Sequence, residues 1–120
     1  MTTSIPQLAE AYVRATNGHD AAAFAALFAD TAQVDDAGRE FRGIEAIKDW
    51  SGREIFDAQV TLEVLDEDHR DGEAVLTTKV DGNFDRTGLP DPVIIMHRLR
   101  FAGDKIVGLT CRLAENWPAR

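Results

Sequence analysis

Three side chains of this 120-residue chain have the chemistry for moving a proton at a substrate: Asp36, Tyr12 and His97. An aspartate carboxylate can accept a proton, and a histidine changes its charge near neutral pH. A tyrosine hydroxyl can donate a hydrogen bond to a developing negative charge. Whether the three act together depends on the helices and strands that carry them.

Asp36 lies near the end of the segment 32–38, which reads AQVDDAG. Side chains alternate between the faces of a strand, so an inward Val34 would place Ala32 and Asp36 on the core face and Gln33 and Asp35 in water. A carboxylate on an apolar face is costly without a partner or a use. The alternative is an ordinary turn over 35–38 in which Asp36 binds only backbone amides.

His97 is the only polar side chain in one alternating row of the segment 93–101; the row reads Val93, Ile95, His97, Leu99 and Phe101. It is either a core histidine whose ring nitrogens are satisfied by neighbours or a cavity-facing acid, base or donor. Tyr12 has the same two interpretations, because buried tyrosines are commonly core residues with their hydroxyl bonded.

The elements that would position these groups follow the order helices first, strands later. Capping residues and apolar spacing predict a helix from Ser4 to Asn17, a second from Asp20 to about Phe28 and a third from Gly43 to about Phe56. Alternation and turn residues predict a short strand at 32–36, then strands at 60–64, 74–80, 93–101 and 106–113. This order predicts an α+β fold with helices packed on one face of a strongly curved, mostly antiparallel sheet that encloses a pocket.

Composition narrows the class of protein. The length and a hydrophobic content of 44% predict a single domain over residues 1–120. A net charge of −8 without a basic patch argues against nucleic acid and anionic membrane as partners. The single Cys111 and a start, Met1 to Ser4, without signal-peptide features predict a cytoplasmic protein. Neither the histidine spacing nor any glycine-rich loop suggests a metal or a cofactor.

Three segments resemble the opening of the NTF2-like superfamily: 11–20 (AYVRATNGHD), 26–36 (ALFADTAQVDD) and 43–47 (GIEAI). The later 99–101 (LRF) and 104–107 (DKIV) resemble its last two strands. The resemblance implies a conical α+β, cystatin-like fold. It specifies the reaction weakly, because this fold hosts isomerases, cyclases, dehydratases, epoxide hydrolases and binding proteins.

Within that superfamily the chain is similar to ketosteroid isomerase, in which an Asp base faces an oxyanion hole made of a tyrosine and a protonated aspartic acid. The resemblance places Tyr12 at the oxyanion tyrosine and Asp36 at the base. His97 stands where the family has the protonated aspartic acid, and SnoaL-like polyketide cyclases, which use acidic and histidine side chains, fit this departure at least as well.

The resemblance therefore implies a cofactor-free acid–base enzyme, an isomerase or cyclase, acting on a small hydrophobic carbonyl or polyketide-like compound. Asp36 would be the base, and Tyr12 and His97 would stabilise the enolate or relay its proton. The candidate walls of the substrate pocket are Phe24, Phe28, Trp50, Phe84 and Leu99. The alternative is a non-catalytic ligand-binding or dimerisation module with the same pocket.

A homodimer through the sheet is also expected. Ile94, Met96, Arg98 and Arg100 alternate on the face of their strand that points away from the pocket. An apolar pair flanked by arginines suits a buried patch with a polar rim. The resemblance points the same way, since many members of the superfamily dimerise by that surface.

Overall fold

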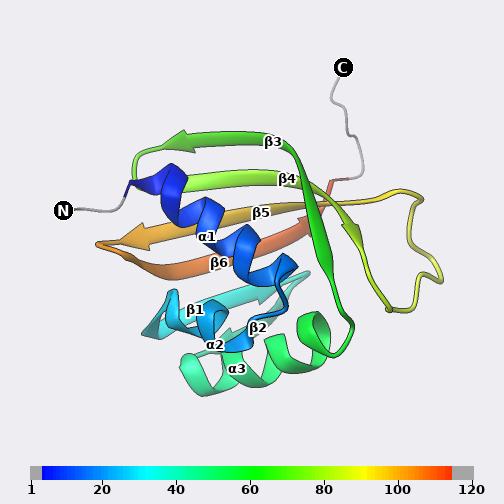
Figure 1. The fold of residues 1–120 in the computed structure, drawn as a ribbon, viewed down its shortest axis with the longest axis horizontal. Coiled ribbons are helices and arrows are strands. Elements are labelled where there is room, and N and C mark those ends of the chain that lie inside the picture. The colour runs from blue at the N-terminus through cyan, green and yellow to red at the C-terminus, as the bar shows by residue number, and fades with distance from the viewer. Residues whose placement is uncertain (1–3, 115–120) are drawn as a thin grey trace.

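The protein forms one curved six-stranded sheet with three helices, seen in a computed structural model that describes residues 4–114 (Figure 1). The strand order is β2-β1-β6-β5-β4-β3; β1 and β6 are parallel, and the other neighbours are antiparallel. The strands are β1 (Phe28–Asp36), β2 (Arg39–Arg42), β3 (Thr61–Arg70), β4 (Glu73–Asp81), β5 (Val93–Ala102) and β6 (Lys105–Leu113). The predicted α+β class, with a mostly antiparallel sheet, is confirmed.

The first two helices begin where the sequence predicts. The Ser4 side chain accepts from the backbone N–H of Gln7, and the Gln7 side chain accepts from the N–H of Ser4, so α1 (Ile5–Asn17) opens with a capping box. The Asp20 side chain caps α2 (Ala21–Ala26) by accepting from the backbone N–H of Ala23. The prediction that this helix runs to about Phe28 is wrong, because Phe28 already pairs with β6 as the first residue of β1.

The third helical segment changes its winding halfway. The helix α3 (Ile44–Ser51) is followed by a π-helical turn, η1 (Gly52–Phe56), in which the N–H of Asp57 bonds the carbonyl of Gly52. A π-turn rotates the residues after it relative to an uninterrupted α-helix. It therefore decides which side chains of this segment face the sheet.

The strands differ from the predicted ones at the sheet's edges. The short β2 was not predicted at all; it forms a hairpin with β1 through Ala37 and Gly38, both at positive φ. The polar segment 66–70, predicted as part of a turn, continues β3. Edge strands are exposed, so β3 tolerates polar side chains on both faces and shows no alternation there.

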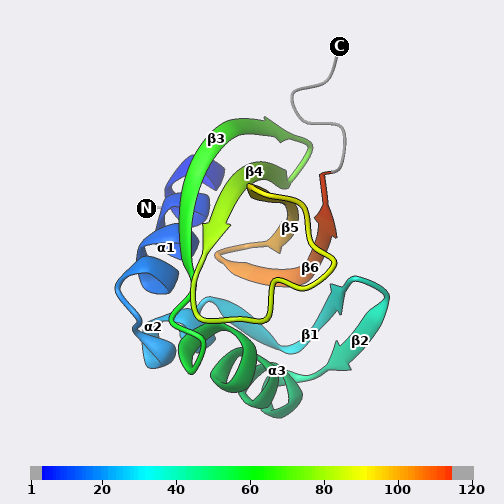
Figure 2. The same ribbon diagram turned by 90° about the vertical axis from the view of Figure 1, so that its right-hand side faces the viewer.

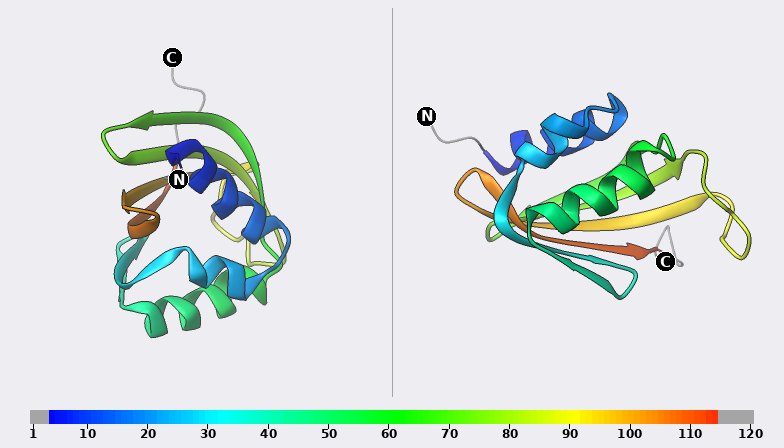
Figure 3. Two further views of the ribbon diagram at one scale, coloured as in Figure 1. Left: turned by 60° about the vertical axis from the view of Figure 1, so that its left-hand side comes forward. Right: turned by 90° about the horizontal axis from the view of Figure 1, so that it is seen from below.

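The sheet curves strongly, and the helices lie on one of its faces (Figures 2 and 3). Register shifts interrupt the pairing of β1 with β6, of β3 with β4 and of β5 with β6, and such bulges bend strands and increase their twist. The segment 82–92 crosses one end of the curved sheet (Figure 2). The inward side chains of the sheet and the buried faces of α1 and α3 form the core.

Within residues 4–114, none of the helices is long and apolar enough to cross a membrane. The first three residues, on which part of the predicted location rests, lie outside the described residues.

Candidate functional site

A cavity of about 350 Å³ opens between α1, η1, the segment 82–92 and the inner face of the sheet. Tyr12, Asp36 and His97 all line it, so the structure brings together the three residues that the sequence singled out. Most of the other wall is apolar: Ile55, Val60, Leu62, Val80, Phe84, Leu89, Val93, Ile95 and Leu113. A mostly apolar pocket with a few convergent polar groups is typical of small-molecule sites.

Asp36 faces this cavity, whereas its neighbour Asp35 makes the side-chain hydrogen bond of the β1–β2 turn. The Asp35 carboxylate accepts from the N–H of Gly38 at 2.9 Å and pairs with Arg112 on the outer side of the hairpin. Ala32 and Val34 are buried with at most 1% of their surface exposed, and Asp36 shares their face, as the alternation predicts. The turn interpretation of Asp36 is therefore wrong, and it applies to Asp35 instead.

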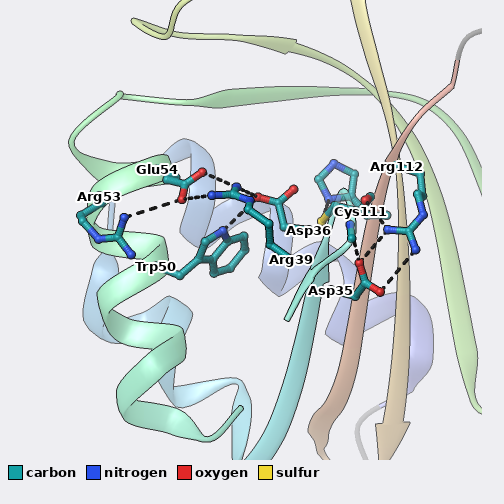
Figure 4. Close-up of polar contacts among 10 residues, drawn as sticks. Asp35, Asp36, Arg39, Trp50, Arg53, Glu54, Cys111 and Arg112 are labelled. Atoms are coloured by element: carbon teal, nitrogen blue, oxygen red, sulfur yellow. Dashed lines mark hydrogen bonds and ion pairs between the residues drawn. The ribbon is translucent and has the colours of Figure 1, made fainter. Parts of the chain in front are cut away.

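The Asp36 carboxylate is held on one side only. Its Oδ2 accepts from Trp50 Nε1 at 3.1 Å and from Arg39 Nη2 at 2.6 Å, as Figure 4 shows. Its Oδ1 has no hydrogen-bond partner among the described residues 4–114. The ion pair satisfies one oxygen and fixes the orientation of the group, while the other keeps its lone pairs available.

Arg39 and Glu54 are site residues that the sequence analysis missed. The guanidinium of Arg39 binds Glu54 with two hydrogen bonds of 2.6 and 2.9 Å, and this pairing is the main cause that raises the pKa of Arg39. Glu54 comes from the π-turn η1, and Arg39 from the unpredicted β2. The three-residue spacing of Asp36 and Arg39 across an Ala-Gly hairpin was the only signal in the sequence that could have indicated the ion pair.

Tyr12 and His97 are buried side by side at the inner wall. The Tyr12 hydroxyl lies 2.9 Å from Nδ1 of His97, and Thr78 Oγ1 lies 3.0 Å from Nε2. Cys111 Sγ is 3.8 Å from Nδ1. The ring nitrogens of His97 are satisfied, as the core interpretation predicts, and the residue also lines the cavity. Its role as an acid, base or donor stays a prediction.

Burial keeps the titratable groups of the inner wall, Tyr12, His97 and Cys111, neutral. It lowers the pKa of His97 to about 4 and raises the pKa of Tyr12 well above its usual value, with smaller contributions from Cys111 and Asp36. Burial likewise raises the pKa of the Cys111 thiol. At neutral pH the inner wall therefore offers uncharged hydrogen-bonding groups, and the charged groups cluster around Asp36.

The low pKa of His97 predicts that the fold loses stability in mild acid. As the pH falls from 6.5 to about 4, the unfolded chain binds a proton at this position and the folded chain does not, so the free energy of unfolding decreases by about 3 kcal/mol. Above pH 6.5 the effect vanishes. Urea unfolding at pH 7 and pH 4.5 should show this loss in the wild type and a smaller loss in His97→Asn; equal losses would contradict it.

The predicted wall residues divide into two groups. Trp50 and Phe84 line the cavity. Phe24, Phe28 and Leu99 do not; they are at most 3% exposed and pack in the core. Their expected role as pocket walls is corrected, because periodicity shows that a side chain is buried but not whether other side chains separate it from a cavity.

Within residues 4–114, His, Cys, Asp and Glu side chains do not gather in any group of three or more that could hold a metal ion.

Several solved structures have a fold similar to that of this chain. The chain is similar to a candidate polyketide cyclase from Sinorhizobium meliloti, with a TM-score of 0.79, 25% identity, and coverage of 90% of this chain and 95% of that one. It is also similar to a protein with a ketosteroid isomerase-like fold from Catenulispora acidiphila in complex with trimethylamine (TM-score 0.74, 24% identity, coverage of 91% of this chain and 86% of that one). An NTF2-like protein of unknown function from Cytophaga hutchinsonii gives a TM-score of 0.76 at 12% identity, with 94% of both chains covered.

No curated protein sequence matches the chain. The model of the SnoaL-like domain, however, matches residues 9–109, which include most of α1, the Asp36 hairpin and His97. With its curved sheet and the site it encloses, the chain belongs to the SnoaL-like domain family, within the NTF2-like superfamily.

Proposed function

We propose that the protein is a cofactor-free acid–base enzyme that acts on a small hydrophobic carbonyl or polyketide-like compound, as an isomerase or a cyclase. One observation carries the proposal. In a mostly apolar cavity, the Asp36 carboxylate is held through Oδ2 and leaves Oδ1 without a partner among residues 4–114, and the buried pair of Tyr12 and His97 lines the same cavity.

The proposed reaction moves one proton. Asp36 Oδ1 removes it from the carbon next to the substrate carbonyl; the electron pair of that C–H bond forms a C=C bond, and the π pair of the carbonyl moves to its oxygen, giving an enolate. The Tyr12 hydroxyl donates to this oxygen. In an isomerisation Asp36 returns the proton to a different carbon. In a cyclisation the enolate carbon attacks a second carbonyl of the same substrate, the π pair of that carbonyl moves to its oxygen, and Asp36 returns the proton to this second oxygen. Positioned proton transfer contributes roughly 10²- to 10⁴-fold in rate.

The residues around Asp36 make it a positioned base. Arg39 and Trp50 hold Oδ2, and Glu54 holds Arg39 from the other side. The hydrogen bond from Arg39 fixes the orientation of the carboxylate toward the cavity. The apolar wall supplies most of the contact with the ligand.

The direct test is an exchange assay on the whole chain. Small cyclic ketones and polyketide-like carbonyl compounds are incubated in D₂O with the protein, and mass spectrometry measures deuterium uptake next to the carbonyl. We expect uptake faster than the uncatalysed rate for at least one compound that binds. A compound that binds tightly and exchanges no faster with the protein than without it favours the second candidate function.

That second candidate is a non-catalytic module that binds small ligands. The position of Tyr12 favours it, because the hydroxyl already has a partner in His97 and binding needs no free donor. In this case the apolar wall alone determines affinity, and no turnover is lost when Asp36 is changed.

Tyr12→Phe should slow the reaction, by less than the roughly 10²- to 10³-fold expected when an oxyanion donor is removed. His97 loses its partner in this variant, and its Nδ1 can then carry a hydrogen toward the oxyanion. A double change, Tyr12→Phe with His97→Asn, should therefore slow the reaction more than either single one. Initial rates of the three variants test this order; a double variant no slower than Tyr12→Phe would contradict it.

We further propose that two copies associate through the outer face of the sheet. Met96 is 37% exposed there, next to the exposed Arg98 and Arg100, whereas Ile94 is already buried within the chain at 8%. The apolar part of the patch is therefore smaller than the sequence suggests. Light scattering should give twice the chain mass of 13.2 kDa at micromolar concentration, and Met96→Asp should give the monomer; a monomeric wild type would contradict the proposal.

A further inference from the structure

The hydrogen-bonded chain of the inner wall continues past His97 to Thr78 on β4. Thr78 is fully buried, and its Oγ1 lies 3.0 Å from His97 Nε2 and 3.2 Å from the carbonyl oxygen of Ile95. At the other end, Tyr12 Oη lies 2.9 Å from Nδ1. A neutral histidine carries one ring hydrogen, so the placement of that hydrogen decides which way every bond in this chain runs.

A hydrogen on Nε2 satisfies the whole chain. Nε2–H donates to Thr78 Oγ1, the Thr78 hydroxyl donates to the Ile95 carbonyl, and the Tyr12 hydroxyl donates to Nδ1. The Cys111 thiol, 3.8 Å from Nδ1, also brings a hydrogen to that nitrogen. Two hydrogen-bearing groups at Nδ1 and an acceptor at Nε2 favour this tautomer in the empty cavity.

A hydrogen on Nδ1 leaves one donor unused. Nδ1–H donates to Tyr12 Oη, and the Thr78 hydroxyl must turn away from the Ile95 carbonyl to donate to Nε2. The Tyr12 hydroxyl then has no acceptor among its described neighbours and is free to donate into the cavity. This second arrangement makes as many hydrogen bonds as the first only when a ligand supplies an acceptor oxygen to Tyr12.

We propose that Thr78 is a positioning residue that holds His97 as the Nε2–H tautomer in the empty cavity, and that a ligand oxygen accepting a hydrogen bond from Tyr12 shifts His97 to the Nδ1–H tautomer. The second half rests on the proposed function. This shift also distinguishes between ligands. A ketone or enolate oxygen can reverse the direction of the hydrogen bonds from Tyr12 to Thr78, and a hydrocarbon of the same shape cannot.

The first half is tested without any ligand or activity. Long-range ¹H–¹⁵N NMR spectra of histidine-labelled protein at pH 7 distinguish a protonated ring nitrogen from an unprotonated one. We expect Nε2–H for His97 in the wild type and in Thr78→Ser, which keeps the hydroxyl. Thr78→Val removes the acceptor and would leave a buried N–H unpaired, so the Nδ1–H population should rise measurably.

The matched control is Thr77→Val on the same strand. Thr77 is also buried, at 6% exposed, but it pairs with Met96 on the opposite face and does not line the cavity. We expect Thr77→Val to leave the His97 tautomer unchanged. A tautomer shift seen only in Thr78→Val is then caused by loss of the Thr78 hydroxyl and not by a general loosening of β4. An unchanged tautomer in Thr78→Val, or Nδ1–H in the wild type, would overturn the assignment.

The second half uses a matched pair of ligands, 1-tetralone and its hydrocarbon analogue tetralin, at millimolar concentration. With 1-tetralone bound, His97 should become Nδ1–H; with tetralin it should stay Nε2–H. If 1-tetralone binds and His97 stays Nε2–H, the ligand-linked shift is wrong, and the exchange assay still decides the proposed function. If 1-tetralone fails to bind, the ligand-linked shift is rejected, the exchange assay still decides the proposed function, and the variants decide the role of Thr78.

Discussion

Asp36→Asn is expected to reduce turnover by roughly 10²- to 10⁴-fold and to leave ligand affinity nearly unchanged. The asparagine keeps the shape of the side chain, and its oxygen can still accept from Trp50 Nε1 and Arg39. Its amide has no basic lone pair to take a proton from carbon. Because the effect falls on the transition state, the loss should appear in kcat, with little change in KM.

The matched control for this variant is Asp35→Asn. Asp35 sits one residue away in the same hairpin and loses the same charge, but it pairs with Arg112 and, unlike that arginine, does not line the cavity. We expect it to retain most of the turnover. A loss of similar size in both variants would point to damage to the hairpin, and an unimpaired Asp36→Asn would remove Asp36 from the role of base.

Phe24→Ala is expected to lower the free energy of unfolding by about 3–5 kcal/mol. Its ring is completely buried and lies 5.1 to 5.6 Å, centroid to centroid, from the rings of Phe28, Phe56 and Tyr12. Truncation removes these contacts and leaves a cavity that the sheet and helices cannot close fully. Because small domains have only about 5–15 kcal/mol of stability, this variant should unfold at a much lower urea concentration.

Phe84→Ala provides the contrast. Phe84 lines the ligand cavity from the segment 82–92, and its ring is partly exposed under the guanidinium of Arg86. We expect a much smaller loss of stability and a clear loss of ligand affinity. Urea unfolding and ligand titration of both variants separate a core side chain from a wall side chain. Equal destabilisation by both would contradict this division.

Local patterns in the sequence were sufficient for several features. Capping residues located the starts of α1 and α2, because a cap depends on side chains within three residues of the helix end. Alternation placed Asp36 on the face of Val34 and His97 on the face of Leu99, because the two-residue period of a strand holds wherever the strand packs. The resemblance to the NTF2-like superfamily added the order of the elements and brought Tyr12, Asp36 and His97 to one cavity.

Only the tertiary structure decided what surrounds these groups. The Arg39–Glu54 pair joins residues 15 apart through a hairpin and a π-turn, and neither element has a strong local signal. Thr78 meets His97 through the pairing of β4 with β5, and Phe24 is core rather than wall because other side chains fill the space beside it. A sequence pattern determines which face a side chain takes; its partners are determined by segments far along the chain that pack against that face.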